Sequence, residues 1–158
     1  MESVANMSTI RDVWLPANSI IRAARKIINT ELRPLGLSSA EGNILLHMLV
    51  RGEKVSQEQL VEQLDISKAA ISRAVDSLGA KGYVIRQRDP EDKRVYQLFL
   101  TDKAGQVART IEQIYNHIYR VARQDISTVE FDELIDLLTR ISKNFIHEQD
   151  KGEHIDAA

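Results

Sequence analysis

The chain has 158 residues, no cysteine and a formal net charge of −2. This length accommodates one compact domain with a sizeable core, and we expect residues 1–158 to form a single domain. The lack of cysteine excludes disulfides, thiolate catalysis and cysteine-ligated metal sites, and the small net charge gives no support to nucleic-acid binding by the chain as a whole.

Charge is unevenly distributed along the chain. The segment from Ile66 to Lys103 contains eight basic and five acidic residues, although the whole chain is slightly acidic. Because binding of nucleic acids depends on where positive charge is concentrated, this segment is the candidate binding region.

The N-terminal part predicts one long helix. Residues 1–12 show little pattern, and we expect them to be frayed or to form an arm. Pro16 follows at a position suited to a first helical turn or a kink, and apolar residues then recur at helical spacing from Ile20 to Leu32. Pro34 ends this run.

Two pairs of residues with the spacing of a capping box predict the starts of the next two helices. Ser38 precedes Glu41 by three residues, and Ser56 precedes Gln59 in the same way. In such a pair, each side chain accepts a hydrogen bond from a free backbone amide at the helix start. The first of these helices should end near Gly52, which provides a stop signal.

A further helix should begin after the cap Ser67 and end near Gly82. Its apolar residues fall at positions i, i+4 and i+7, which places Ile71, Val75 and Leu78 on one buried side. The opposite side has small, polar and charged residues, which allow close approach to a groove: Lys68, Ala69, Ser72, Arg73 and Asp76.

Two strand-like segments follow, Val84–Arg88 and Val95–Leu100, and a charged loop containing Pro90 separates them. Val55 is expected to form a short third strand. Alternation in the last strand places three residues on the face that packs against the helices: Tyr96, Leu98 and Leu100.

The C-terminal part predicts two long helices, one capped by Thr101 and one opened by the capping pair of Ser127 and Glu130. The apolar side of the first contains Val107, Ile111, Ile114, Ile118 and either Val121 or Ala122. The second is rich in leucine and isoleucine. Residues 148–158 are polar and acidic, and we expect a disordered tail there.

The order of elements over residues 38–101 is that of a winged helix-turn-helix, a shape that enters DNA grooves. The fold class is therefore mainly α with a small β-wing. The helices within residues 10–34 and 102–147 flank a region that could fold without them, so we expect them to form an interface.

The loop and the second long strand contain a family pattern. Residues Asp92, Arg94, Leu98, Leu100, Thr101 and Gly105 fit D-x-R-x-x-x-L-x-L-T-x-x-x-G. This pattern resembles that of the MarR family of transcription regulators, and the resemblance covers most of residues 10–147.

The resemblance implies a homodimer that binds double-stranded DNA at a near-palindromic operator, most often as a ligand-responsive repressor. The flanking helices would join the two copies, and Ile114 and Ile118 would lie in that interface. Recognition helices would enter successive major grooves, and the wings would reach the flanking minor grooves.

The resemblance also implies DNA-binding positions. These are Lys68, Ala69, Ser72 and Arg73 on the recognition helix, beside the cap Ser67, and Arg94 at the wing tip, beside Lys93. Asp92 would orient Arg94. Ala69 and Ala70 stand where many members have a hydroxyl residue, so base reading would depend on the other recognition-helix positions.

For each of these positions an ordinary structural role remains open. Arg94 would then only pair with Asp92 on a solvated loop, and Lys68 and Arg73 would belong to a solvated charged face. Arg86 and Arg88 share a strand face and either follow DNA phosphates or pair with acids of the loop.

In the resembled family, small aromatic or phenolic anions bind between the dimer helices and the winged domain. Apolar and polar side chains that would line such an effector site are Trp14, Arg22, Arg25, His47, Tyr115 and Tyr119. The alternative is ordinary packing or dimer contact.

Other functions have less support in the sequence. The four histidines show no short paired spacing, so we expect no metal site and no cofactor. Without a glycine-rich phosphate loop or a metal-binding helix motif, we expect no enzyme. The remaining alternative is a winged-helix protein-interaction module that does not read DNA. With no apolar run near the roughly 18 residues of a membrane span, we expect a cytoplasmic protein.

Overall fold

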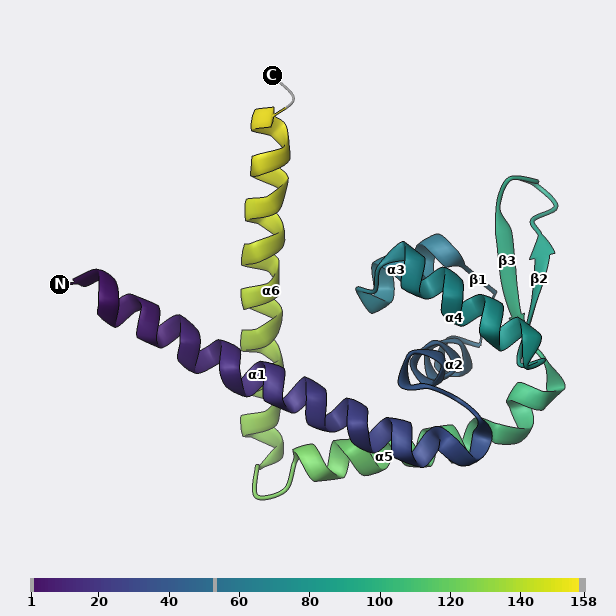
Figure 1. Ribbon diagram of the computed structural model, residues 1–158, viewed down its shortest axis with the longest axis horizontal. Helices are drawn as coiled ribbons and strands as arrows, with labels where there is room; N and C mark the ends of the chain where they lie inside the picture. Colours follow the sequence, from purple (N-terminus) through teal and green to yellow (C-terminus); the bar gives the residue numbers. More distant parts are fainter. Residues whose placement is uncertain (1, 53, 157–158) are drawn as a thin grey trace. The chain divides into compact units, whose positions relative to one another are not determined.

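The computed structural model describes residues 2–52 and 54–156, with side chains described for residues 11–52 and 54–149. Its elements are α1 (Glu2–Leu32), the 3-10 turn η1 (Arg33–Leu35), α2 (Ser39–Arg51), β1 (Val55–Ser56), α3 (Gln57–Leu64), α4 (Lys68–Ala80), β2 (Val84–Arg88), β3 (Tyr96–Leu100), α5 (Asp102–Ala122) and α6 (Thr128–Asp156) (Figure 1). The predicted fold class, mainly α with a small β-wing, is confirmed. Contacts divide the chain into two compact units, residues 1–118 and 119–158.

Helix α1 is longer than expected. It begins at Glu2, so the segment that we expected to be frayed is helical, and Pro16 lies inside the helix rather than in its first turn. The residues before Pro16 include no glycine, and several of them are good helix formers, which favours this extension.

Both predicted capping boxes at the starts of α2 and α3 are formed. The amide of Ser38 donates to Glu41 Oε2 over 2.7 Å, and the amide of Glu41 donates to Ser38 Oγ over 3.3 Å. The amide of Ser56 donates to Gln59 Oε1 over 2.8 Å in the same manner. These bonds satisfy amides that would otherwise be free, so they fix where each helix begins.

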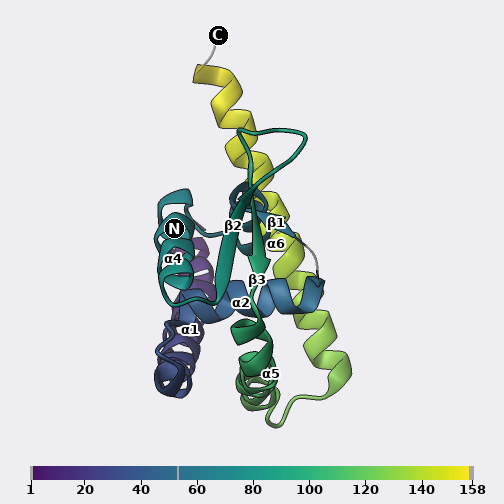
Figure 2. The ribbon, with the colours of Figure 1, turned by 90° about the vertical axis from the view of Figure 1, so that its right-hand side faces the viewer.

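The core of the first unit joins every element from α1 to α5. Helix α2 lies in its middle, between α4 and α5 (Figures 1 and 2). Ile114 belongs to this core and is only 6% exposed, so its assignment to a dimer interface is wrong. An apolar stripe looks the same in a sequence whether it faces its own chain or another. The most deeply buried side chains are Leu32, Ile44, Leu45, Met48, Leu60, Ile71, Leu78, Leu98 and Ile111.

The sheet is antiparallel with the order β1-β3-β2, and Val55 of β1 pairs with Leu98 of β3. The loop end of the β2–β3 ribbon projects beyond α4 (Figures 1 and 2). Leu98 is fully buried as expected, whereas Tyr96 is 39% exposed. Tyr96 pairs with Arg88 at the end of the ribbon next to the loop, beyond the reach of the helices, so the prediction that it packs on them is wrong.

In the second unit, α6 begins at the predicted capping pair. Ser127 Oγ and its amide both donate to Glu130 Oε2, over 2.6 and 2.9 Å. These bonds, the first of them above all, hold the pKa of Glu130 below its usual value. The helix continues to Asp156, where we expected a disordered tail from residue 148, and residues 157–158 of that tail lie outside the described residues. None of the described helices is long and apolar enough to cross a membrane.

Candidate nucleic-acid interface

Helix α4 presents two different sides. Ile71, Val75 and Leu78 are at most 2% exposed and pack into the core, as predicted. The opposite side is open to solvent and contains Lys68, Ala69 and Arg73, with Ser72 half-buried beside them. The helix is therefore fixed by one side while the other is free to meet a partner.

The turn between α3 and α4 has two local determinants. Asp65 adopts a left-handed conformation with φ of 50°, which aspartate tolerates better than most residues. Ser67 Oγ then accepts a hydrogen bond from the amide of Ala70 over 3.3 Å and caps α4. Ser67 is exposed, so this cap lies at the accessible end of the helix.

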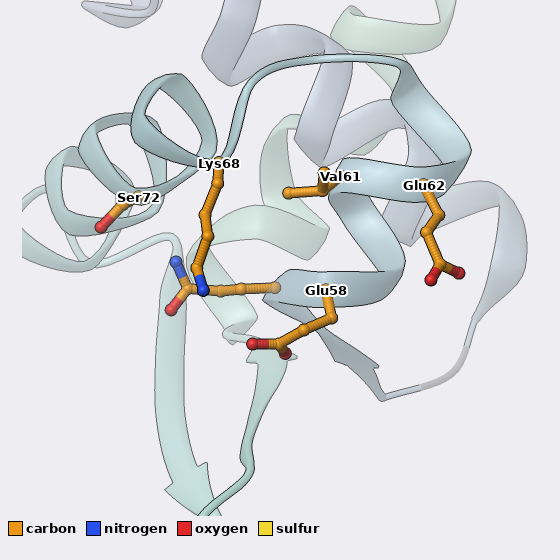
Figure 3. Close-up of a pocket in the computed structure, with 6 residues that line it drawn as sticks. Glu58, Val61, Glu62, Lys68 and Ser72 are labelled. Atoms are coloured by element: carbon orange, nitrogen blue, oxygen red, sulfur yellow. The ribbon is translucent and has the colours of Figure 1, made fainter. Parts of the chain in front are cut away.

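A hollow of about 310 Å³ separates α3 from the start of α4. Figure 3 shows Lys68 extending from α4 toward Glu58 of α3, with Val61 pointing into the hollow between the helices. Glu62 also lines it. The sequence reasoning missed these two carboxylates, although their i, i+4 spacing on α3 placed them on one side of that helix. The surface therefore offers both hydrogen-bond donors and acceptors, which base edges in the major groove can use.

The loop between β2 and β3 holds Arg94 through its backbone. Asp92 Oδ1 accepts from the amide of Arg94 over 3.0 Å, and the carbonyl of Asp92 accepts from the amide of Val95 over 3.0 Å. Asp92 thus contacts the main chain of Arg94, not its guanidinium group. Among the side chains of residues 11–52 and 54–149, the structure forms no ion pair to Lys93 or Arg94.

The two strand arginines are held differently. Arg86 makes an ion pair of 2.8 Å with Asp76 of α4, and Arg88 donates from Nε to the hydroxyl of Tyr96 over 3.1 Å. The guanidinium of Arg88 also lies over the Tyr96 ring, 5.4 Å from its centroid. Neither arginine pairs with an acid of the loop, one of the two roles left open by the sequence. The described part of the chain therefore leaves Lys68 and Arg73, like the two wing cations, without an acidic partner.

The residues proposed for an effector site occupy separate environments, and all but Tyr119 belong to the first unit. Arg22 and Arg25 line an open groove of about 370 Å³ along α1. His47 Nε2 lies 2.6 Å from Gln63 Oε1 of α3, and Trp14 is 58% exposed.

The two tyrosines of that set differ from each other. Tyr115 is half-buried, its hydroxyl has no hydrogen-bond partner among the described residues, and burial raises its pKa to about 12. Tyr119 belongs to the second unit, where its ring meets Phe131 edge-on at 5.4 Å and its hydroxyl accepts from Arg123 over 3.1 Å.

Within the described residues, no three acidic or histidine side chains are arranged to hold a metal ion.

Comparison with known proteins agrees with this architecture. Residues 35–95 match the sequence profile of the MarR family. The solved structure of the transcriptional regulator SlyA is 28% identical with a TM-score of 0.80, over 87% of this chain and 96% of that one.

Two further solved structures are similar over nearly the same length. A putative MarR family transcriptional regulator from Listeria monocytogenes, complexed with 26mer DNA, is 27% identical with a TM-score of 0.78, over 88% of this chain and 89% of that one. A MarR transcriptional regulator from Methanosarcina mazei Go1 is 25% identical with a TM-score of 0.75, over 87% of this chain and 98% of that one. With its helix-turn-helix, its wing and these likenesses, the chain has the fold of MarR-family transcription regulators, and the family profile matches its residues 35–95.

Proposed function

We propose that this regulator acts as a homodimer that binds a near-palindromic operator in double-stranded DNA, as a ligand-responsive repressor in the cytoplasm. The observation that carries the proposal is the placement of cations without acidic partners on two elements. Lys68 and Arg73 lie on the open side of α4, while Lys93 and Arg94 lie on the projecting wing loop. A helix with exposed cations suits a DNA major groove, and a β-ribbon with a cationic loop suits the adjacent minor groove.

The two elements would contribute differently to binding. In the major groove, each base pair presents a distinct pattern of donors and acceptors, so Arg73 and Lys68 would supply sequence preference. A narrow minor groove has enhanced negative potential but a degenerate pattern, so Arg94 would supply affinity and a preference for DNA shape. Ser72 would add a short-range polar contact.

The exposed apolar surface of α6 favours the proposal of a dimer. Apart from Phe131, the large apolar side chains of this helix within the described residues are from 40% to 66% exposed, among them Val129, Leu134, Leu138 and Ile141. A second copy would cover this surface and set the distance between two recognition helices. An effector would act by binding more tightly to a dimer geometry that does not match successive grooves.

The test begins with selection of bound duplexes from a random pool. We expect two half-sites whose centres are about 10 to 11 base pairs apart, the spacing of adjacent major grooves. Fluorescence anisotropy on the selected duplex should then show affinity that falls steeply with salt, because bound cations release counterions from DNA. Absence of binding at low salt would instead favour a protein-interaction module.

Arg94→Ala should weaken binding to the selected duplex and to nonspecific duplex together, by about 1 to 3 kcal/mol. The matched control is Arg109→Ala, which removes another exposed arginine, from α5. Sedimentation should show the same oligomeric state for both variants. Equal affinities for the two variants would remove Arg94 from the interface.

A further inference from the structure

Asp89, the residue directly after β2, organises the wing loop. Its amide donates to the carbonyl of Val95 over 2.9 Å, which closes the loop. Its Oδ1 accepts from the amides of Glu91 and Asp92, over 2.9 and 3.4 Å. The side chain of Asp92 in turn accepts a hydrogen bond from the amide of Arg94. A continuous series of hydrogen bonds therefore leads from Asp89 to Arg94.

The other carboxylate oxygen of Asp89 connects the loop to the body of the sheet. Oδ2 accepts from Gln97 Nε2 of β3 over 3.1 Å and lies 3.6 Å from the ammonium of Lys54, the residue before β1. Asp89 is well covered, since its side chain is 14% exposed, whereas that of Lys54 is 55% exposed. The Asp89 side chain thus connects the loop to Gln97 in β3 and to Lys54 just before β1.

We propose that Asp89 is a positioning residue that holds the wing loop, and with it Arg94, in the conformation that meets DNA. This inference rests on the proposed DNA-binding function. A mobile loop would lose conformational freedom when it binds, and that loss would oppose affinity. A loop already ordered by Asp89 avoids most of that cost.

Because Asp89 is charged, the proposal can be tested by whether its neutralisation weakens or strengthens DNA binding. The hydrogen bond from the Glu91 amide, the largest influence, holds the pKa of Asp89 below its usual value, so it carries a negative charge at neutral pH. Charge alone therefore predicts that neutralising Asp89 strengthens binding to the DNA polyanion. Positioning predicts the opposite, because the neutral amide of asparagine would turn a donor toward Gln97 and Lys54.

Glu91 supplies a matched control on the same loop. It is exposed, and its carboxylate forms no hydrogen bond or ion pair with the side chains of residues 11–52 and 54–149. Glu91→Gln removes the same charge as Asp89→Asn but leaves the loop contacts in place. We expect equal or slightly tighter binding for Glu91→Gln and about threefold to tenfold weaker binding for Asp89→Asn.

Two further measurements separate positioning from a general loss of structure. In an Arg94→Ala background, Asp89→Asn should cause little additional loss of affinity, since the residue that it positions is gone. Amide hydrogen exchange of the free protein should accelerate for residues 89–95 in Asp89→Asn and Asp89→Ala, but not for α2 or α4.

Each outcome decides one of the two proposals. If wild-type protein binds no duplex, the proposed function fails, while exchange in residues 89–95 still shows whether Asp89 orders the loop. If wild-type protein binds but Asp89→Asn binds as tightly as Glu91→Gln, or if exchange in the loop is unchanged, Asp89 does not position Arg94.

Discussion

Leu45 and Leu98 belong to the first unit, residues 1–118, which contains the wing and is called the winged unit below. They have no solvent exposure, whereas Leu134 and Leu138 of α6 are 43% and 49% exposed. The same residue type therefore stabilises the two regions in different ways. A buried leucine contributes to folding as soon as its own chain closes around it, but an exposed one contributes only when a partner covers it. The winged unit has its core within the chain, and we infer that α6 obtains its core from a second copy.

The largest expected effect is in the winged unit. Leu98→Ala should lower the free energy of unfolding by about 2 to 5 kcal/mol, because it leaves a cavity under the sheet. Urea denaturation at two protein concentrations should give the same loss at both. A loss that depends on concentration would mean that this core is not self-contained.

Leu138→Ala should act on association instead. Removal of apolar contacts of this size costs the dimer about 1 to 3 kcal/mol, so the dimer dissociation constant should rise by a factor of about 5 to 150. Analytical ultracentrifugation over a concentration series measures it, with Glu133→Gln on the same helix as control. Unchanged dissociation would place the dimer contact elsewhere than this side of α6.

Two glycines test how tightly the winged unit is packed. A Cβ at Gly42 of α2 would clash with Cδ1 of the buried Leu32, so Gly42→Ala should destabilise by about 1 to 3 kcal/mol. A Cβ at Gly105 of α5 would meet no atom within 4 Å, so Gly105→Ala should stabilise by about 0.5 to 1 kcal/mol. Thermal melts of both variants would show the opposite signs. A stable Gly42→Ala variant would indicate that the Leu32 side chain moves aside easily.

The pH dependence of stability tests the Glu41 network. Burial raises the pKa of Glu41. Hydrogen bonds from Lys81, Ser77 and Ser38 lower it by more than burial raises it, so the pKa lies below 4.5. A lowered pKa in the folded state means that the stabilisation is present at neutral pH and is lost as the pH falls below about 4.5.

Glu41→Gln should therefore lower the free energy of unfolding by about 1 to 2 kcal/mol at pH 7, a modest value because the Lys81 side chain is 36% exposed. The difference from the wild type should shrink toward pH 3. Glu130→Gln in the exposed capping pair of α6 should show a smaller change. A Glu41→Gln difference that is the same at pH 7 and pH 3 would show that charge is not involved.

Local features were predictable from the sequence because neighbouring residues determine them. The capping pairs placed the starts of α2, α3 and α6, and the charged loop with Pro90 between two strand-like segments placed β2 and β3. The two sides of α4 followed from helical spacing alone. These signals act within a few residues, so no knowledge of the tertiary fold was needed.

Features that depend on distant neighbours were not predictable. The side on which Ile114 is buried, the exposure of Tyr96 and the pairing of Arg86 with Asp76 all depend on how elements are arranged in space. The role of Asp89 was missed for the same reason, since its partner Lys54 is far away in the sequence. The sequence shows which residues are polar, but it does not show which of them form hydrogen bonds or ion pairs within the folded chain.

The pairing of β1 with β3 also bears on how the chain folds. Val55 precedes both helices of the helix-turn-helix and Leu98 follows them, yet the two residues are partners in the sheet. Helices α3 and α4 form through contacts between near neighbours, whereas this strand pair must close a long loop, which is slower. We therefore expect β1 to pair with β3 after α3 and α4 have formed.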